Sequence, residues 1–394
     1  MRILVYPAHM EIGGSQMNAV ELAHGVAERG HEVVMFGPDG ALTSTVKELG
    51  LEYVRAPREH RWPSPRNMRR LRRLVGERGI DIVHAYEWGP CLDLAFGPHA
   101  KLGTPLVTTV LSMSVPAFLP EHAPLVVGTP ELADEQRRLR SIAHLIEPPI
   151  DTVKNAPTGR RGRSRERFGC APDEVVLAIV CRLTSELFKL DGVLEAIEVV
   201  ERIGADHPIR LLVVGDGPGL GVVADRAAEV NRLLRRPAVS AVGGMLDPRD
   251  AYDAADVVFG HGSSALKGMA FAKPLVVHGR KGFWRLVDES SLQPFLDHGW
   301  WGMGDGDGPG ALQSVLEWLL VRRDRWEVLG RFGRRVVEER YSLEQAIDAQ
   351  IDVYRQALAF RPSPDTARRS LRRTAVEVAK YRARTNLVRF DLRR

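Results

Sequence analysis

The feature that most constrains the fold is an alternation of short apolar runs with helical stretches. The chain opens with "RILVYP", continues through the amphipathic stretch "SQMNAVELAHGVAERG" and returns to the β-branched run "HEVVMFG". A second series begins near residue 175 with "EVVLAIVCRL" and proceeds through "IRLLVVGDGP" and "ADVVFGHG" to "KPLVVHG". Such alternation is typical of parallel sheets whose two faces are covered by helices. The sequence therefore predicts an α/β chain with two consecutive doubly wound sheets.

The length of 394 residues is sufficient for two domains, each with its own core. A stretch rich in proline, arginine and small polar residues separates the two series, and this composition indicates a linker. We expect a first Rossmann-like domain over residues 1–150, a linker over 151–168 and a second Rossmann-like domain over 169–345. Residues 346–394 are expected to form a helix that returns to the first domain, followed by a basic tail.

Composition places the chain among globular proteins of a reducing compartment. Hydrophobic residues make up 44% of the chain, and no apolar run reaches the roughly 18 residues of a membrane span. Three scattered cysteines are too few for a disulfide framework or a zinc site. The opening "MRILVYP" is too short for a signal peptide. We therefore expect a cytoplasmic protein.

Positive charge is concentrated at the C-terminus. Residues 366–394 contain ten arginines and lysines but two acidic residues, whereas the whole chain has a formal net charge of +5. Two interpretations stay open for this tail, a solvated helix face and peripheral contact with the anionic inner face of a membrane. Nucleic acid is not expected as a partner, because no aromatic residues are interleaved as stacking platforms.

The first candidate site follows the first predicted strand, in "EIGGSQMNAVELA". Gly13 and Gly14 permit close backbone approach, and Ser15 can cap the helix that follows, so that a phosphate or a sugar hydroxyl fits there. The alternative is an ordinary glycine-serine turn without a ligand. The stretch lacks the G-x-G-x-x-G spacing of a dinucleotide site, which argues against a nicotinamide enzyme.

Further candidate residues follow strands of the second series. In "CRLTSELFKLDG", Arg182 and Lys189 are two cations that can neutralise a diphosphate. In "GHGSSALKGMAFAKPLVV", the small residues Gly262, Ser263 and Ser264 precede a helix whose free N–H groups can bind an anion. Each cation taken alone is more typical of an ordinary surface residue. Together these stretches indicate a phosphate or nucleotide site.

These stretches, in this order, resemble the retaining GT-B glycosyltransferases of family 4. The resemblance covers roughly residues 1 to 360 and depends on "GGSQ", "PPIDT", "CRLTSELFKLDG", "VVGDGPG", "ADVVFGHGSSALKGMAFAKPLVV" and "RRVVEERYSLEQAIDAQIDVYRQAL". It implies two Rossmann-like domains that face a central cleft, with the acceptor held mostly by the first domain and a nucleotide-sugar donor mostly by the second.

The resemblance also implies roles for individual residues. Relatives often carry His-x-His at the exit of the fourth strand, where this chain has His84-Ala85-Tyr86-Glu87, so that Tyr86 replaces a histidine near the sugar. The residues expected to take part in catalysis are Arg182, Lys189, Tyr86 and Glu87. Those expected to bind the donor are Gly13, Gly14, Ser15, Gly243, Gly244, Met245, Leu246, Gly262, Ser263, Ser264 and Lys267.

Lys267 is the sharpest departure from the family pattern. Relatives commonly have a glutamate at this position, whose carboxylate accepts hydrogen bonds from ribose hydroxyls. A lysine has three donors and no acceptor, so it cannot hold ribose in that way. Three explanations stay open: Lys267 contacts phosphates or an acidic donor sugar, it points to solvent while another group holds the ribose, or the site has lost donor binding.

The expected reaction moves a sugar from a nucleoside diphosphate to a hydroxyl or amine of a small-molecule, lipid or glycan acceptor, with retention of configuration. No metal or cofactor is expected, because Arg182, Lys189 and the helix amides would neutralise the leaving diphosphate and no Asp-x-Asp motif ends a strand. Bacterial natural-product or cell-surface glycan biosynthesis is the expected context. The alternatives are a non-catalytic nucleotide- or phosphate-binding module of the same fold and a nucleotide-sugar epimerase.

Overall fold

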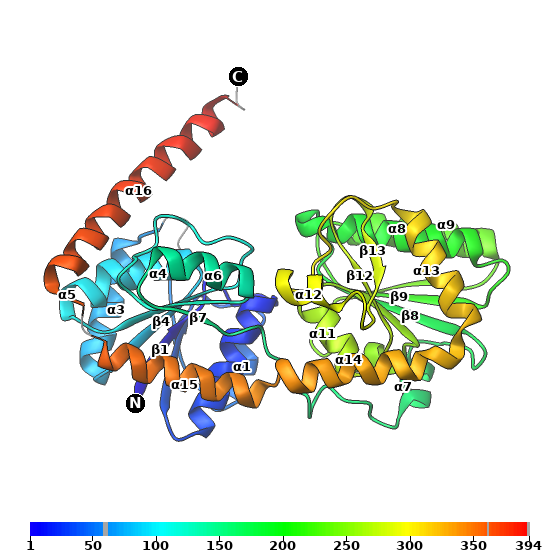
Figure 1. Cartoon of the computed structure of the whole chain (residues 1–394), viewed down its shortest axis with the longest axis horizontal. Helices are drawn as coiled ribbons and strands as arrows, with labels where there is room; N and C mark the ends of the chain where they lie inside the picture. Colours follow the sequence, from blue (N-terminus) through cyan, green and yellow to red (C-terminus); the bar gives the residue numbers. More distant parts are fainter. Residues whose placement is uncertain (58–61, 361, 392–394) are drawn as a thin grey trace. The chain divides into compact units, whose positions relative to one another are not determined.

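The structure is a computed structural model that describes residues 1–57, 62–360 and 362–391. The chain divides into two compact units (Figure 1). Unit 1 comprises Met1–Pro149 together with the chain from Leu343 onwards, and unit 2 comprises Ile150–Ser342. The prediction of an α/β chain with two Rossmann-like sheets is confirmed, because each unit contains one twisted, mainly parallel sheet between helices.

Unit 1 contains a seven-stranded sheet with the order β3-β2-β1-β4-β5-β6-β7. Every pairing in it is parallel. The order reverses between β1 and β4, which lie side by side although residues 7–81 separate them in the chain. The strands are β1 (Arg2–Tyr6), β2 (Glu32–Gly37), β3 (Glu52–Arg55), β4 (Ile82–Tyr86), β5 (Leu106–Val110), β6 (Leu125–Val127) and β7 (Ala143–Leu145).

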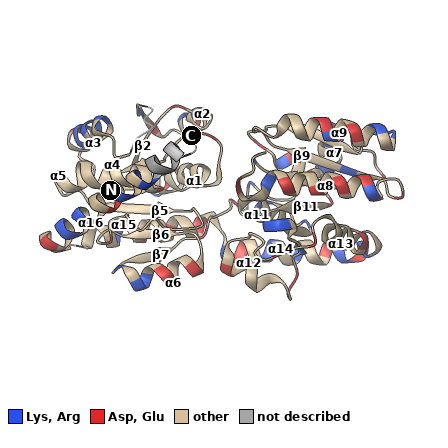
Figure 2. Ribbon diagram, turned by 90° about the horizontal axis from the view of Figure 1, so that it is seen from above, with Lys and Arg blue, Asp and Glu red and all other residues tan. Residues whose placement is uncertain are grey.

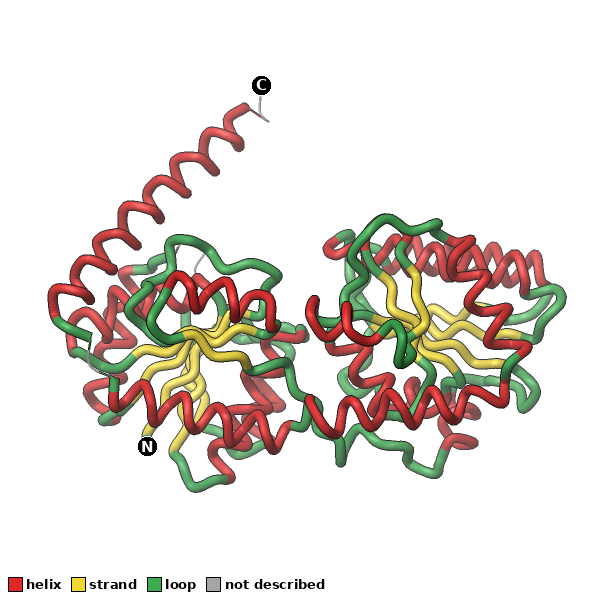
Figure 3. The backbone as a smooth tube through the Cα atoms, in the orientation of Figure 1, coloured by secondary structure: helices red, strands yellow, loops and turns green. Residues whose placement is uncertain are grey.

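Helices cover both faces of this sheet, as Figure 3 shows. One core contains buried residues of α1 and α15, and the opposite core contains buried residues of α3, α4 and α6. The helices of unit 1 are α1 (Gly14–Glu28), α2 (Thr43–Glu48), α3 (Pro65–Arg78), α4 (Trp88–Leu94), a π-helical turn over Ala95–His99, α5 (Ala100–Leu102), α6 (Pro130–Leu139), α15 (Leu343–Ala359) and α16 (Pro364–Asp391).

Helix α15 returns from the far end of the sequence to complete the core of unit 1. A Cβ atom on Gly25 of α1 would lie 2.1 Å from Cδ1 of Ile347, so a larger residue at this position would force the Ile347 side chain to shift. The hydroxyl of Tyr354 lies 2.7 Å from Nδ1 of the buried His84 in β4, and Thr109 Oγ1 lies 2.7 Å from the other ring nitrogen. Helix α15 therefore satisfies a polar group in the middle of the sheet.

Helix α16 follows and packs its apolar side against the rest of unit 1. Thr374 and Val378 are buried, and the ring of Tyr381 lies 5.3 Å from that of Phe118, centroid to centroid. The final three residues of the predicted basic tail lie outside the described residues. Within the described ranges, no helix is long and apolar enough to cross a membrane.

Unit 2 contains a six-stranded sheet with the order β10-β9-β8-β11-β12-β13. The first five strands are parallel, whereas β13 pairs antiparallel with β12 at the edge. Five of the six residues of the central β8 are buried, which matches its continuous apolar run "VVLAIV". The strands are β8 (Val175–Val180), β9 (Ile209–Val214), β10 (Val239–Gly243), β11 (Val257–Gly260), β12 (Leu275–His278) and β13 (Trp284–Leu286).

Helices of unit 2 also form two layers. Buried residues of α8, α9 and α13 form one core, and those of α10, α11, α12 and α14 form the other. Residues 151–168, predicted as a linker, belong instead to unit 2 and include α7. The helices are α7 (Arg161–Arg167), α8 (Lys189–Ile203), α9 (Leu220–Leu234), α10 (Arg249–Ala254), α11 (Ser263–Ala270), α12 (Leu292–His298), α13 (Pro309–Val321) and α14 (Trp326–Arg340).

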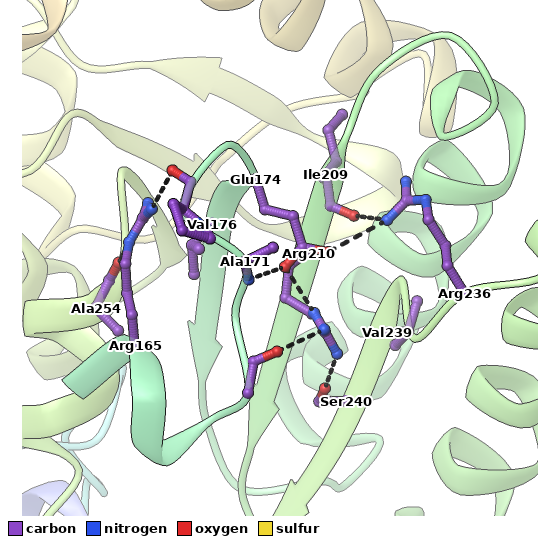
Figure 4. A network of polar contacts seen from close by, with 12 residues as sticks. Arg165, Ala171, Glu174, Val176, Ile209, Arg210, Arg236, Val239, Ser240 and Ala254 are labelled. Atoms are coloured by element: carbon purple, nitrogen blue, oxygen red, sulfur yellow. Dashed lines mark hydrogen bonds and ion pairs between the residues drawn. The ribbon is translucent and has the colours of Figure 1, made fainter. Parts of the chain in front are cut away.

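Buried ion pairs explain why this arginine-rich stretch is structured. Arg165 of α7 pairs with Asp256 at 2.5 Å and also donates to the carbonyl of Ala254. Close by, Arg210 of β9 lies 3.3 Å from Glu174, and both side chains are more than 90% buried (Figure 4). Arg210 also donates to the carbonyl of Gly169. Through Arg165, Gly169 and Glu174, these bonds attach the end of the arginine-rich stretch to the sheet.

The Glu174–Arg210 pair supports a stability prediction. Glu174→Leu leaves the Arg210 guanidinium buried without its carboxylate, so we expect a loss of about 3 kcal/mol in the free energy of unfolding. Denaturant titration measures it. The double variant Glu174→Leu/Arg210→Met should recover at least about 1 kcal/mol of this loss, because no unpaired charge then stays buried. The control Glu198→Gln breaks an exposed pair with Arg202 and should cost less than about 0.5 kcal/mol, and an equal loss in both single variants would contradict the prediction.

Candidate functional site

The carboxyl edge of the unit 2 sheet contains the point at which the strand order reverses. The chain leaves β8 toward β9 on one side, while β11 pairs with β8 on the other side. In open α/β sheets this arrangement creates a crevice outside the carboxyl ends of the strands, where ligands bind. The residues that follow β8 and β11 are Cys181-Arg182 and His261-Gly262-Ser263, and they include the predicted site residues Arg182, Gly262 and Ser263.

Helix α11 begins at this edge with an unusual backbone turn. Its N-cap is Gly262, whose φ of 55° and ψ of −134° favour glycine. No side chain caps the helix, and its first N–H groups therefore remain available to an anion. Ser263 and Ser264 are the first two helical residues and are half-buried. The Ser264 hydroxyl donates to the carbonyl of His261 at 3.0 Å, so Ser263 offers the more available hydroxyl of the two.

Lys189 is the first residue of α8 and is half-buried. The two preceding residues, Leu187 and Phe188, have positive φ angles of 53° and 56°, a strained conformation that places the lysine at the helix entry. Arg182 is exposed two residues beyond β8. In the described part of the chain, neither Arg182 nor Lys189 forms an ion pair with an acidic residue. Two cations without acidic partners thus lie along one edge of the sheet.

Two buried histidines lie at the same edge, and neither is among the site residues predicted from the sequence. His261 is 8% exposed and His278 is 1% exposed, and burial, followed by the nearby positive charge of Lys189, lowers the pKa of His261 to about 4. The pKa of His278 also lies well below the usual value for histidine, mainly because of its burial. The signal available in the sequence was a histidine at the end of each of two neighbouring strands, in "GHG" and "VVHG".

The loop after β10 carries the residues expected to face the base. Gly243 has a φ of 83°, Gly244 and Leu246 are exposed, and Met245 is half-buried between them. Lys267 of α11 lies close enough to this loop to contribute to the lowered pKa of Asp247, although the hydrogen bond from Arg249 is the main cause. Lys267 is half-buried and, in the described ranges, its side chain forms neither a hydrogen bond nor an ion pair.

In unit 1 the structure brings Ser15 and Glu87 together. Glu87 follows β4 with a φ of 69°, a conformation that is strained for a residue with a side chain. Its carboxylate accepts hydrogen bonds from Ser15 Oγ at 3.3 Å, from Leu111 N at 3.0 Å and from Ser112 Oγ at 2.7 Å. Glu87 therefore connects the loops that follow β1, β4 and β5 at the carboxyl edge of this sheet.

The structure bears on two predictions about unit 1, those for Tyr86 and Ser15. Tyr86 is 1% exposed and packs in the core beside His84, with ring centroids 4.6 Å apart, so its buried ring has a packing role. Ser15 is the second residue of α1 and gives its hydroxyl to Glu87, so it does not cap the helix. The N-cap is Gly13, and Gly14 begins the helix.

Comparisons with known proteins agree with these features. Residues 12–147 match the model of Glycosyltransferase Family 4. A D-inositol 3-phosphate glycosyltransferase from Saccharomonospora viridis is 28% identical over 65% of this chain, a match that covers 58% of that relative. The chain thus spans less than two thirds of that protein's length. A protein of the same name from Xylanimonas cellulosilytica is 25% identical over 91% of this chain and 95% of its own length.

Solved structures show the same fold at low sequence identity. A glycosyltransferase from Rickettsia africae superposes with a TM-score of 0.73 at 15% identity, over 91% of this chain and 98% of the other. Anabaena HepE, solved in complex with UDP and glucose, superposes with a TM-score of 0.70 at 14% identity, over 90% and 99% of the two chains. The chain thus has the two-domain Rossmann-like GT-B fold, and its N-terminal part and these relatives make it similar to glycosyltransferases of the family 4 type.

Proposed function

We propose that this protein transfers a sugar from a nucleoside diphosphate to a hydroxyl or amine of an acceptor, with retention of configuration at the anomeric carbon. The observation that carries the proposal is the carboxyl edge of the unit 2 sheet. There Arg182 and Lys189 have no acidic partners among the described residues, and the uncapped N-terminus of α11 begins at the same edge. A diphosphate has the charge and the oxygen atoms that such an edge binds.

The proposed mechanism needs no protein side chain as the general base. The leaving phosphate oxygen takes the proton from the acceptor nucleophile on the same face of the sugar, while the bond from the anomeric carbon to that oxygen breaks and a bond to the acceptor forms. Arg182, Lys189 and the N–H groups of α11 stabilise the negative charge that grows on the diphosphate. Because these groups supply the positive charge, the proposal requires no metal ion or other cofactor.

Unit 1 is proposed to hold the acceptor. Glu87 fixes three carboxyl-edge loops through Ser15, Leu111 and Ser112, and its carboxylate is half-buried, so that one oxygen can also accept a hydrogen bond from an acceptor hydroxyl. The relatives named for D-inositol 3-phosphate act on a polyol, which is compatible with such a site. We place the reaction in bacterial natural-product or cell-surface glycan biosynthesis.

A nucleotide panel tests donor binding and the role of Lys267. UDP, GDP, ADP, CDP and dTDP are added separately to the wild type and to Lys267→Glu, and the unfolding temperature is measured. One nucleotide should raise the wild-type unfolding temperature, because a ligand that binds the folded state stabilises it. At a ligand concentration a hundredfold above Kd, the free energy of unfolding rises by about 2.7 kcal/mol. Loss of that rise in Lys267→Glu would assign Lys267 to the site. Stabilisation of the variant alone would instead favour the non-catalytic binding module.

Catalysis is tested with the sugar derivative of the nucleotide that binds. Arg182→Ala and Lys189→Ala should each lower kcat for release of the nucleoside diphosphate about a hundredfold or more, because each removes positive charge that stabilises the leaving group. Arg202→Ala, on the exposed end of α8, is the matched control and should keep wild-type activity. NMR of the product should show the anomeric configuration of the donor. Inverted product, or full activity of both variants, would refute the mechanism.

The surface of α16 supports a further part of the proposal, in which this cytoplasmic protein binds peripherally to the anionic inner face of a membrane. Figure 2 shows positive residues on α16. Arg369, Arg372 and Arg384 are exposed, whereas Thr374 and Val378 face unit 1. Each exposed cation near an anionic surface contributes about 1 kcal/mol of attraction.

Vesicle sedimentation tests this contact. The triple variant Arg369→Gln/Arg372→Gln/Arg384→Gln should lose most binding to phosphatidylglycerol-containing vesicles at low salt and keep its fold, because the substituted side chains are exposed. The charge-matched control carries Gln at the exposed Arg322, Arg323 and Arg325 of unit 2 and should sediment like the wild type. Equal sedimentation of all three proteins would exclude α16 as the membrane contact.

A further inference from the structure

Four buried polar atoms at the carboxyl edge of the unit 2 sheet have no hydrogen-bond partner among the described residues. They are Thr184 Oγ1, His261 Nε2, and both ring nitrogens of His278. A buried polar atom without a partner costs roughly 1 to 3 kcal/mol, and such atoms are rare in folded proteins. Three residues with this cost at one edge of one sheet indicate a site that is built for a ligand.

The two imidazoles form a fixed pair. Their ring centroids lie 4.7 Å apart at an interplanar angle of 69°, an edge-to-face contact. On its other side, His278 contacts Trp284 of β13, with centroids 5.3 Å apart. The indole N–H of Trp284 donates to Glu195 of α8 at 2.5 Å, which fixes the tryptophan in turn. Rings held in this way cannot rotate freely to find other partners.

Helix α8 makes room for this pair. A Cβ atom on Gly192, in the first turn of α8, would lie 2.5 Å from Nδ1 of His278, so any larger residue would displace the imidazole. This close contact brings the first turn of α8, and with it Lys189, beside the histidines. The lysine acts electrostatically on both rings and lowers both pKa values.

The charges around the pair favour an anion. Helix α8 contributes Lys189 and Glu195, the half-buried Cys181 follows β8, and Glu195 is already bonded to Trp284. Burial keeps both imidazoles neutral at neutral pH, and each neutral ring has one N–H to donate. The site thus offers neutral N–H donors beside one lysine and the N-terminus of α11, a combination that suits phosphoryl oxygens.

We propose that the His261–His278 pair is part of the diphosphate site: His261 donates its ring N–H to a phosphoryl oxygen at the N-terminus of α11, and His278 is a positioning residue that holds the His261 ring by their edge-to-face contact. This inference rests on the proposed function, because it assigns the oxygen to the nucleoside diphosphate of the donor. Thr184 Oγ1 is a further hydrogen-bonding atom at the same edge.

The test compares stability with binding in His261→Phe and His278→Phe. Phenylalanine keeps a flat ring and removes the unpaired nitrogens, so the unfolding temperature should stay equal or rise. Affinity for the stabilising nucleoside diphosphate and for inorganic pyrophosphate, measured by calorimetry, should fall about tenfold or more in His261→Phe. His278→Phe keeps a ring that can hold His261 in place and should retain more affinity than His278→Gln, which has no ring. The control His207→Phe, which precedes β9 at the opposite edge of the sheet, should bind like the wild type.

Proton uptake on binding distinguishes direct contact between His261 and a phosphoryl oxygen from a purely structural role of the histidine. A phosphoryl oxygen next to His261 favours the charged imidazole, so binding should take up protons at neutral pH, measured by calorimetry in two buffers of different ionisation enthalpy. His261→Phe should abolish this uptake, whereas His278→Phe, which keeps the ring contact, should retain most of it. Equal affinity and equal uptake in wild type and His261→Phe would overturn the inference and leave ordered water as the partner of these atoms. If neither nucleotides nor pyrophosphate bind even the wild type, the proposed function fails as well.

Discussion

The need to cover both faces of each parallel sheet governs the rest of this structure. Because every strand of unit 1 and five of the six strands of unit 2 run parallel, most of them are connected by helices, and these helices bury apolar residues on both faces. Polar chemistry is thereby confined to the strand ends. Some polar groups that do lie inside are paired, as His84 is by Tyr354 and Thr109 and as Arg210 is by Glu174. The histidines at the ends of β11 and β12 have ring nitrogens without a partner among the described residues, and they lie at the edge where we propose that the diphosphate binds.

Much of the fold followed from local patterns. Continuous apolar runs predicted the central strands, and helical periodicity predicted the elements between them, because both patterns reflect burial on known faces. Glycines and small residues after these runs marked the carboxyl-edge turns, so Ser263 and Ser264 lie at a helix N-terminus and Lys189 lies at a helix entry. The residues that surround an anion in this architecture were therefore accessible from the sequence.

Other features depended on contacts between distant residues. At the end of β4 the chain turns with a positive φ at Glu87, and this turn decides that Glu87 lies at the edge while Tyr86 stays in the core. Residues 151–168 looked like a linker because arginine and proline usually indicate exposed chain. Asp256, far along the sequence, pairs with Arg165, and this ion pair helps to hold the stretch in the folded unit 2. His278 ends an otherwise apolar strand, and its lack of a partner is visible only once its neighbours are placed.

The position of α15 has a consequence for synthesis on the ribosome. Unit 2 is one continuous segment and is complete as soon as Ser342 has been made, whereas unit 1 still lacks the helix that contains Ile347 and Tyr354. Until then, the face of α1 around Gly25 is uncovered, and His84 lacks one of its two partners. The segment that is translated first is therefore the last to be completed, and its nascent apolar face is a candidate surface for chaperones during that interval.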